Sequence, residues 1–128
     1  MNLLLDTHSL LWVYWNDPKL STTAAQLVTD PTNRVLVSPA SYWEIAIKIK
    51  TSKLVLRESF LDFVRHAILD NGFAILPIEP AHCDQLTTLP FHHKDPFDRL
   101  LVAQALAEDI PILSIDPILD AYGIQRLW

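Results

Sequence analysis

Short apolar runs alternate with longer segments of helical spacing along this chain. The apolar runs have the length of buried strands and lie at residues 2–5, 34–37, 73–76, 110–115 and 125–128. Between them, apolar residues recur at spacings of three and four, which indicates amphipathic helices, at residues 7–15, 21–28, 39–50, 61–71, 79–86 and 95–108. Strands that alternate with helices predict an α/β fold, with a mostly parallel sheet and helices on both faces.

Capping residues support several of these boundaries. Ser21 and Ser38 are suited to accept hydrogen bonds from the free amides of a helix start, and Asp95 is followed by a proline at the first helical position. The fourth helix ends near Gly72, because glycine readily takes the left-handed conformation that closes a helix. The apolar positions that mark this fourth helix are Leu61, Val64, Ile68 and Leu69.

Length and composition indicate a single globular domain over residues 1–128. A chain of 128 residues buries about two thirds of its unfolded surface. Half of the residues are hydrophobic and only 2 are glycine, which excludes a linker or a disordered tail. The one cysteine, Cys83, has no partner for an internal disulfide, so we expect a buried thiol and a reducing cytoplasm. Asp6 and His8 interrupt the apolar start before the length of a membrane span or signal peptide, so we expect no membrane association.

The charge balance bears on nucleic-acid binding. A net charge of -5 argues against a broad basic surface, but it allows a nucleic acid substrate if the acids gather around a metal. The only basic cluster is suited to hold a phosphate backbone, and it comprises Lys48, Lys50, Lys53 and Arg57. The alternative is a solvated helix end whose cations complement the helix dipole.

Four acids fall near strand ends. Asp6 and Asp116 lie where an apolar strand gives way to a helix. Glu44 lies in the helix after another strand, and Asp98 lies in the helix before the last interior strand. Open α/β sheets bind ligands at the carboxyl ends of their strands, so the four side chains are expected to converge. Four converging carboxylates repel one another unless a cation lies among them, and oxygen-only ligands favour Mg²⁺ or Mn²⁺.

Each acid alone also fits a structural role. Asp116 precedes Pro117 and is placed to cap a turn, while Ser41 and Glu44 match the spacing of a capping box. Glu44 is also one helical turn from a possible ion-pair partner, Lys48. A cap is the commoner role for any single acid, so it is the set of four that favours a metal site.

Asp98 is the acid that capping explains least. It shares a helix face with Leu101, Val102 and Ala105, and a face of this kind is expected to be buried. An unpaired buried carboxylate is costly. Asp95 is the better cap, so we assign Asp95 to the helix start and Asp98 to the metal site.

Other side chains near these acids have two interpretations each. Arg99 either contacts a phosphate or neutralises the acids. His92 and His93 lie in a loop and are interpreted as surface residues in preference to metal ligands. Three tryptophans are expected in the core, with a groove for a partner as the alternative: Trp12, Trp15 and Trp43.

Four ordered blocks of the sequence resemble a known family. They read Leu-Leu-Asp-Thr-His at 4–8, Ser-Pro-Ala-Ser-Tyr-Trp-Glu-Ile-Ala-Ile-Lys at 38–48, Asp-Pro-Phe-Asp-Arg-Leu-Leu-Val-Ala-Gln-Ala at 95–105, and Leu-Ser-Ile-Asp at 113–116. Together they resemble the PIN-domain family, and most of all its VapC-type toxins, the ribonuclease halves of bacterial and archaeal type II toxin-antitoxin pairs. The closing residues 122–128 also look like one VapC-like subgroup, so the resemblance spans the chain.

This resemblance implies a fold, an activity and a set of site residues. It implies a five-stranded parallel sheet flanked by helices, RNA cleavage dependent on Mg²⁺ or Mn²⁺, homodimerisation, and a cognate antitoxin that covers the cleft. By motif, the family's four acids fall on Asp6, Glu44, Asp98 and Asp116. A hydroxyl is kept at Ser114, where many relatives have threonine. Residues expected to support the acids are Thr7, Ser38, Asp95 and Ser114, and residues expected to contact RNA are Lys48, Lys50, Lys53 and Arg99.

We therefore hypothesise hydrolysis of RNA phosphodiester bonds, with the four acids holding one or two cations that activate water. One alternative is a catalytically silent domain whose acids only bind a metal or a basic partner segment. A less favoured alternative makes Asp6 a phosphoacceptor, as in haloacid-dehalogenase phosphatases or receiver domains. Such a phosphatase requires a second aspartate two residues further along, where this chain has His8.

Overall fold

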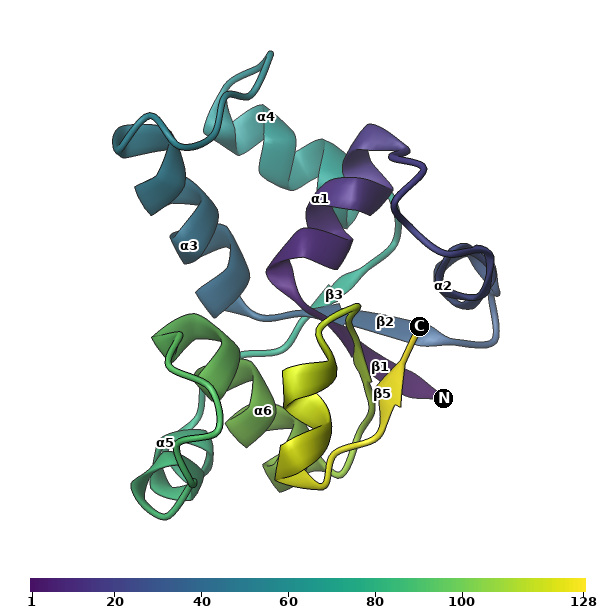
Figure 1. Ribbon diagram of the computed structural model, residues 1–128. Helices are drawn as coiled ribbons and strands as arrows, with labels where there is room; N and C mark the ends of the chain where they lie inside the picture. The colour runs from purple at the N-terminus through teal and green to yellow at the C-terminus, as the bar shows by residue number, and fades with distance from the viewer.

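The computed structural model describes residues 1–128 and contains one sheet of five parallel strands (Figure 1). The strands are β1 (Asn2–Leu5), β2 (Arg34–Val37), β3 (Ala74–Ile75), β4 (Ile112–Leu113) and β5 (Arg126–Leu127). Their order across the sheet is β3-β2-β1-β4-β5, and every neighbouring pair is parallel. This confirms the predicted α/β fold and places β1 at the centre of the sheet.

The helices connect the strands and cover the sheet. They are α1 (Thr7–Trp15), α2 (Thr22–Thr29), α3 (Pro39–Lys50), α4 (Phe60–Val64), α5 (Pro80–Thr87) and α6 (Pro96–Glu108), with a π-helical turn η1 (Arg65–Leu69) and a 3-10 helix η2 (Pro117–Tyr122). The predicted caps are confirmed, since Ser21, Ser38 and Asp95 each accept backbone amide hydrogen bonds at a helix start. No helix combines the length and the hydropathy needed to cross a membrane.

Two hydrophobic cores lie on opposite faces of the sheet. Leu3 and Leu5 of β1 pack with residues of α1, α2 and α4, whereas Leu4 packs with residues of α6 and η2. Figure 1 shows the same division, with α1 and α4 on one side of the sheet and α5 and α6 on the other. Successive strand residues point to opposite faces, so a strand buried on both faces is apolar at every position. This explains the uninterrupted apolar run of β1.

The fourth helix differs from its prediction. Leu61 and Leu69 are 77% and 60% exposed, while Phe63 and Ala67 are completely buried. Ile68 is completely buried, as predicted. The π-helical turn η1 continues α4, and a turn with one extra residue rotates the buried face after Val64 away from the regular spacing.

Two further predictions about burial were wrong. Cys83 is exposed on α5, so it is not a core thiol. Trp43 is 60% exposed and Trp15 is 43% exposed, and only Trp12 is half-buried, with its ring 5.7 Å from that of Trp128. Helical spacing alone therefore overstated the apolar face of α1 and α3.

The order of the strands reverses beside β1. The chain steps from β1 to β2 and β3 on one side, and then crosses to β4 on the other side of β1. A crevice forms at such a switch point, outside the carboxyl ends of the two strands. Asp6 follows β1 directly, and Asp116 lies just beyond β4, so both acids are placed at this crevice.

Candidate metal centre at the switch point

Asp6 is a buried acid at the carboxyl end of the central strand, β1. It is only 5% exposed, and its side chain caps α1 by accepting a hydrogen bond of 2.8 Å from the amide of Ser9. Burial raises the pKa of the Asp6 carboxyl, and hydrogen bonds from Ser114 and Ser9 oppose this shift. Ser114, predicted to support the acids, thus contacts the Asp6 carboxyl.

Asp98 projects from the first turn of α6 towards the same crevice. Its side chain is 25% exposed, and apart from His93 at 3.3 Å no polar partner approaches its carboxylate. Burial raises the pKa of Asp98 to about 7, and the negative charges of Asp95, Asp6 and Glu44 add to the effect. Asp98 therefore lies in the field of three other acids and lacks a compensating cation.

Asp116 is fixed by hydrogen bonds on both carboxylate oxygens. Oδ1 accepts from the amide of Ile118 at 3.0 Å and caps η2, so the predicted capping role of Asp116 is confirmed. Oδ2 lies 2.9 Å from Nε2 of His93. The amide of Asp116 also donates to Oγ of Ser114 at 3.1 Å, so the turn after β4 holds the carboxylate in a defined direction.

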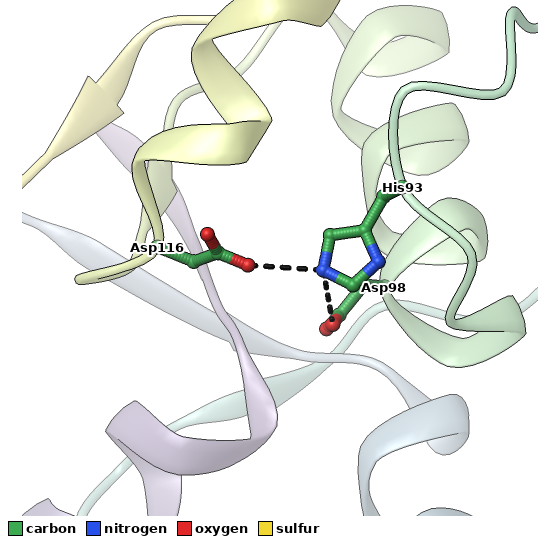
Figure 2. A group of neighbouring side chains, drawn as sticks. All are labelled: His93, Asp98 and Asp116. Carbon is green, nitrogen blue, oxygen red and sulfur yellow. Dashed lines mark hydrogen bonds and ion pairs between the residues drawn. The ribbon is translucent and has the colours of Figure 1, made fainter.

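His93 completes this group, and its assignment to the surface was wrong. Figure 2 shows the imidazole between Asp98 of α6 and Asp116, the N-cap residue of η2, with Nε2 directed at both carboxylates. Its side chain is 16% exposed, and ligand atoms of the three residues lie within 4.8 Å of one another. No sequence pattern indicated this position, because His93 lies in a loop without helical or strand spacing.

These residues line one open pocket of about 670 Å³. The lining residues are Asp6, His8, Trp12, His93, Asp95, Asp98, Ile115, Asp116 and Pro117. Three of the four predicted acids thus share a pocket, which has room for hydrated ions and part of a polymer.

Glu44 lies beside this pocket and not in its lining. It is 5% exposed, with Oε1 accepting from Oγ1 of Thr7 at 2.7 Å and Oε2 2.8 Å from Nζ of Lys48. The predicted ion pair with Lys48 is therefore present. The alternative capping box with Ser41 is wrong, because Ser38 caps α3.

Glu44 lines a second, smaller cavity of about 210 Å³. Lys48 and Lys53 line it together with Glu44, and Asp95 lines both cavities. Lys50 is exposed and lines neither cavity. The basic cluster is therefore divided, and two of its lysines lie next to the acids.

The predicted supporting residues have different positions. Thr7 touches Glu44 and Ser114 touches Asp116, so both contact the acids. Asp95 accepts from the amide of Asp98 at 3.1 Å and caps α6, as predicted. Ser38 accepts from a backbone amide within α3 and lines neither cavity, so it supports the helix start alone.

Arg99 is buried and engaged by the loop before α6. Its Nη1 donates to the carbonyl of Pro90 at 2.7 Å, and its Nη2 donates to that of Leu89 at 3.1 Å. The guanidinium also lies 3.3 Å from Oη of Tyr122 and 4.0 Å from the ring centre of Phe91. Neither role predicted for Arg99, phosphate contact or neutralisation of the acids, fits this position.

The donor set of the pocket suits a hard divalent cation. Its ligand atoms are mainly carboxylate oxygens, the preferred ligands of Mg²⁺ and Mn²⁺. The position of Asp98 among other acids and the raised pKa values of Asp6 and Asp98 indicate negative charge that a cation would compensate. The residues present therefore fit such a metal.

Several solved structures share this fold. VapBC2 from Rickettsia felis bound to a promoter DNA fragment aligns over 99% of this chain and 98% of that chain, with a TM-score of 0.73 and 13% identity. DNA-bound VapBC from Salmonella typhimurium aligns over 99% and 97%, with a TM-score of 0.71 and 14% identity. VapBC-1 from nontypeable Haemophilus influenzae aligns over 99% and 97%, with a TM-score of 0.69 and 19% identity.

Sequence comparison gives the family. No curated protein matches the chain significantly in sequence. The family model described as the PIN domain, in contrast, matches residues 3–124, which is nearly the whole chain. The chain therefore belongs to the PIN domain family.

Proposed function

We propose that this protein is a metal-dependent endoribonuclease. The observation that carries the proposal is the convergence of Asp6, Asp98 and Asp116 from three separate elements on one pocket at the switch point of the sheet. Burial without compensating positive charge is unfavourable for Asp6 and Asp98, and a divalent cation relieves it. Membership of the PIN domain family supports nuclease chemistry at this position.

The proposed metal ligands are Asp6, Asp98 and Asp116, with Glu44 acting directly or through water from the neighbouring cavity. A bound Mg²⁺ or Mn²⁺ supplies Lewis acidity that lowers the pKa of water and stabilises charge on the leaving oxygen. The expected products carry a 5′-phosphate and a 3′-hydroxyl. Asp116 is held in place by two hydrogen bonds, whereas the carboxylate of Asp98 keeps free oxygen lone pairs.

The substrate path runs over the smaller cavity. Lys48 and Lys53 both line it; Lys53 is exposed, and Lys48 is paired with Glu44. Ammonium groups at these positions would hold the phosphates of a single strand, because phosphate contacts fix the register of a nucleic acid. Lys48 is engaged by Glu44, so Lys53 is the more available of the two lysines.

We also place the protein as the toxin of a type II toxin-antitoxin pair. The solved structures of the same fold are described as VapBC complexes, two of them bound to DNA, which supports a protein antitoxin as the partner of this chain. Homodimerisation and action in the cytoplasm belong to the same proposal.

The test is cleavage of a single-stranded RNA by the purified protein with Mg²⁺, with Mn²⁺ and with EDTA. Cleavage with either cation, its absence in EDTA, and its loss in Asp6→Asn and Asp98→Asn are expected. Asp17→Asn is the matched control, because Asp17 lies in a turn after α1 and lines neither cavity. Wild-type cleavage by Asp98→Asn would refute the assignment, and metal binding without any cleavage would support the catalytically silent domain.

A further inference from the structure

The proton of the His93 imidazole is placed by the backbone. The amide of Asp95 donates a hydrogen bond of 3.0 Å to Nδ1 of His93, so Nδ1 must accept. A neutral imidazole has one donor nitrogen and one acceptor nitrogen. The proton therefore lies on Nε2, and Nε2 is a hydrogen-bond donor.

This donor faces two carboxylates. Nε2 lies 2.9 Å from Oδ2 of Asp116 and 3.3 Å from Oδ2 of Asp98 (Figure 2). The other oxygen of Asp116 already accepts from the amide of Ile118. The imidazole thus gives the second oxygen of Asp116 a donor and lies between carboxylates that come from two different elements.

The loop that carries His93 is itself held in place. The amide of His93 donates to Oη of Tyr122 at 2.7 Å, and Arg99 binds the carbonyls of Leu89 and Pro90 in the same loop. Tyr122 belongs to η2, the helix that Asp116 caps. The loop, α6 and η2 are therefore connected at the pocket, and the imidazole has a fixed position relative to both acids.

We propose that His93 is a positioning residue of the metal centre, whose Nε2–H holds the carboxylates of Asp116 and Asp98 in the arrangement that a divalent cation needs. This inference rests on the proposed function, because it concerns the same pocket. It assigns His93 to the hydrogen-bond shell of the acids and not to the metal ligands.

A ligand role for His93 would require the opposite tautomer. Histidines that bind a metal usually donate the other ring N–H to a carbonyl or carboxylate. Here the other nitrogen accepts from an amide, so a lone pair on Nε2 is available only if the Asp95 contact breaks. Donors that orient ligating carboxylates typically change metal affinity by about 10- to 100-fold when they are removed.

The first test determines the tautomer of the His93 imidazole in the protein without metal, from two-bond ¹⁵N–¹H couplings of the imidazole rings. His93 is expected to show protonation at Nε2, with its signal assigned by its loss in His93→Ala. Protonation at Nδ1 would overturn the inference whatever the activity of the protein.

The second test is calorimetric titration of wild type and variants with MgCl₂ and with MnCl₂. His93→Ala is expected to lower the affinity for both cations by about tenfold or more. His93→Gln keeps a side-chain N–H and is expected to recover most of that affinity. His92→Ala is the control, because His92 is exposed and packs on Tyr122 outside the pocket. Thermal unfolding of each variant verifies that it is folded.

The outcomes separate the two proposals. A wild-type protein that binds neither cation contradicts the proposed function. A wild-type protein that binds them as tightly as His93→Ala overturns only the role of His93. Equal losses in His93→Ala and His93→Gln would make His93 a ligand and also overturn the inference, because glutamine keeps a side-chain N–H but not the imidazole lone pair.

Discussion

Oγ1 of Thr7 donates a hydrogen bond of 2.7 Å to Oε1 of Glu44, across 37 positions of the chain. Thr7 is 2% exposed and Glu44 is 5% exposed, so the bond is shielded from water. It ties the first turn of α1 to the middle of α3, next to Asp6. The acid of α3 is thereby held beside the centre although it does not line the main pocket.

Replacing Thr7 by valine removes this donor while keeping the shape of the side chain. Loss of a hydrogen bond to a buried carboxylate should reduce the free energy of unfolding by about 1–3 kcal/mol. Thr23→Val is the matched control, because Thr23 is exposed on α2 and should change stability by less than about 0.5 kcal/mol. Urea unfolding measures the free energy of unfolding of both variants. Equal values would show that the hydrogen bond does not stabilise the protein.

The stability of the metal-free protein should fall as pH rises towards neutrality. The pKa of Asp98 is about 7 in the folded chain, above its ordinary value of 3.8, so the folded state binds more protons between these values. This contribution to stability is complete below about pH 4 and is lost as pH rises through about 7. The raised pKa of Asp6 acts in the same direction.

Melting temperatures in EDTA across this pH range measure the effect. Asp98→Asn should show a flatter decline than wild type, because asparagine does not titrate. Saturating Mg²⁺ should raise the melting temperature of wild type more at pH 8 than at pH 5, since the cation binds the ionised acids. A wild-type curve parallel to that of Asp98→Asn would contradict the raised pKa.

The fold could be predicted because each apolar run is bounded by clear signals, but the extent of β4 could not. The run 110–115 predicts a long strand, whereas the ladder covers only Ile112–Leu113. The amide of Ile110 bonds to the carbonyl of Ala105 and closes α6. Hydrogen-bond partners far along the chain decide where a strand ends, and the hydropathy pattern does not predict these partners.

Arg99→Lys should destabilise the protein without changing its affinity for RNA. A lysine ammonium cannot span the carbonyls of Leu89 and Pro90 as the guanidinium does, so a loss of about 1.5–3 kcal/mol is expected. Arg34→Lys is the control, because Arg34 is exposed at the start of β2. Chemical unfolding gives the stability, and a selective loss of RNA affinity in Arg99→Lys would instead support the phosphate contact.

Lys53→Gln should weaken RNA binding more than Lys50→Gln. Lys53 borders the cavity next to the acids, whereas Lys50 lies outside both cavities. Removal of one phosphate contact to a single strand should lower the salt dependence of binding by about 0.7 in the log–log slope. Fluorescence anisotropy with a labelled RNA, in an Asp98→Asn background, measures the affinity of each variant. Equal losses for the two lysines would contradict the proposed substrate path over the smaller cavity.

The candidate site was only partly visible in the sequence. The four acids could be named because Asp6 and Asp116 lie at strand ends, and Glu44 and Asp98 lie in helices next to strands. His93 could not, because its position depends on the path of a loop held by Arg99 and Tyr122, and its contact with Asp116 spans 23 positions. Arg99 was misplaced for the same reason, since its partners are backbone carbonyls that a sequence pattern does not locate.

The most direct test of the metal centre is the anomalous scattering of a crystal of this protein grown with MnCl₂. We predict a manganese peak in the pocket, within coordination distance of carboxylate oxygens of Asp98 and of Asp6 or Asp116, and its absence in crystals of Asp98→Asn. An empty pocket in well-ordered wild-type crystals, or a peak bound only by surface acids such as Asp17, would contradict it.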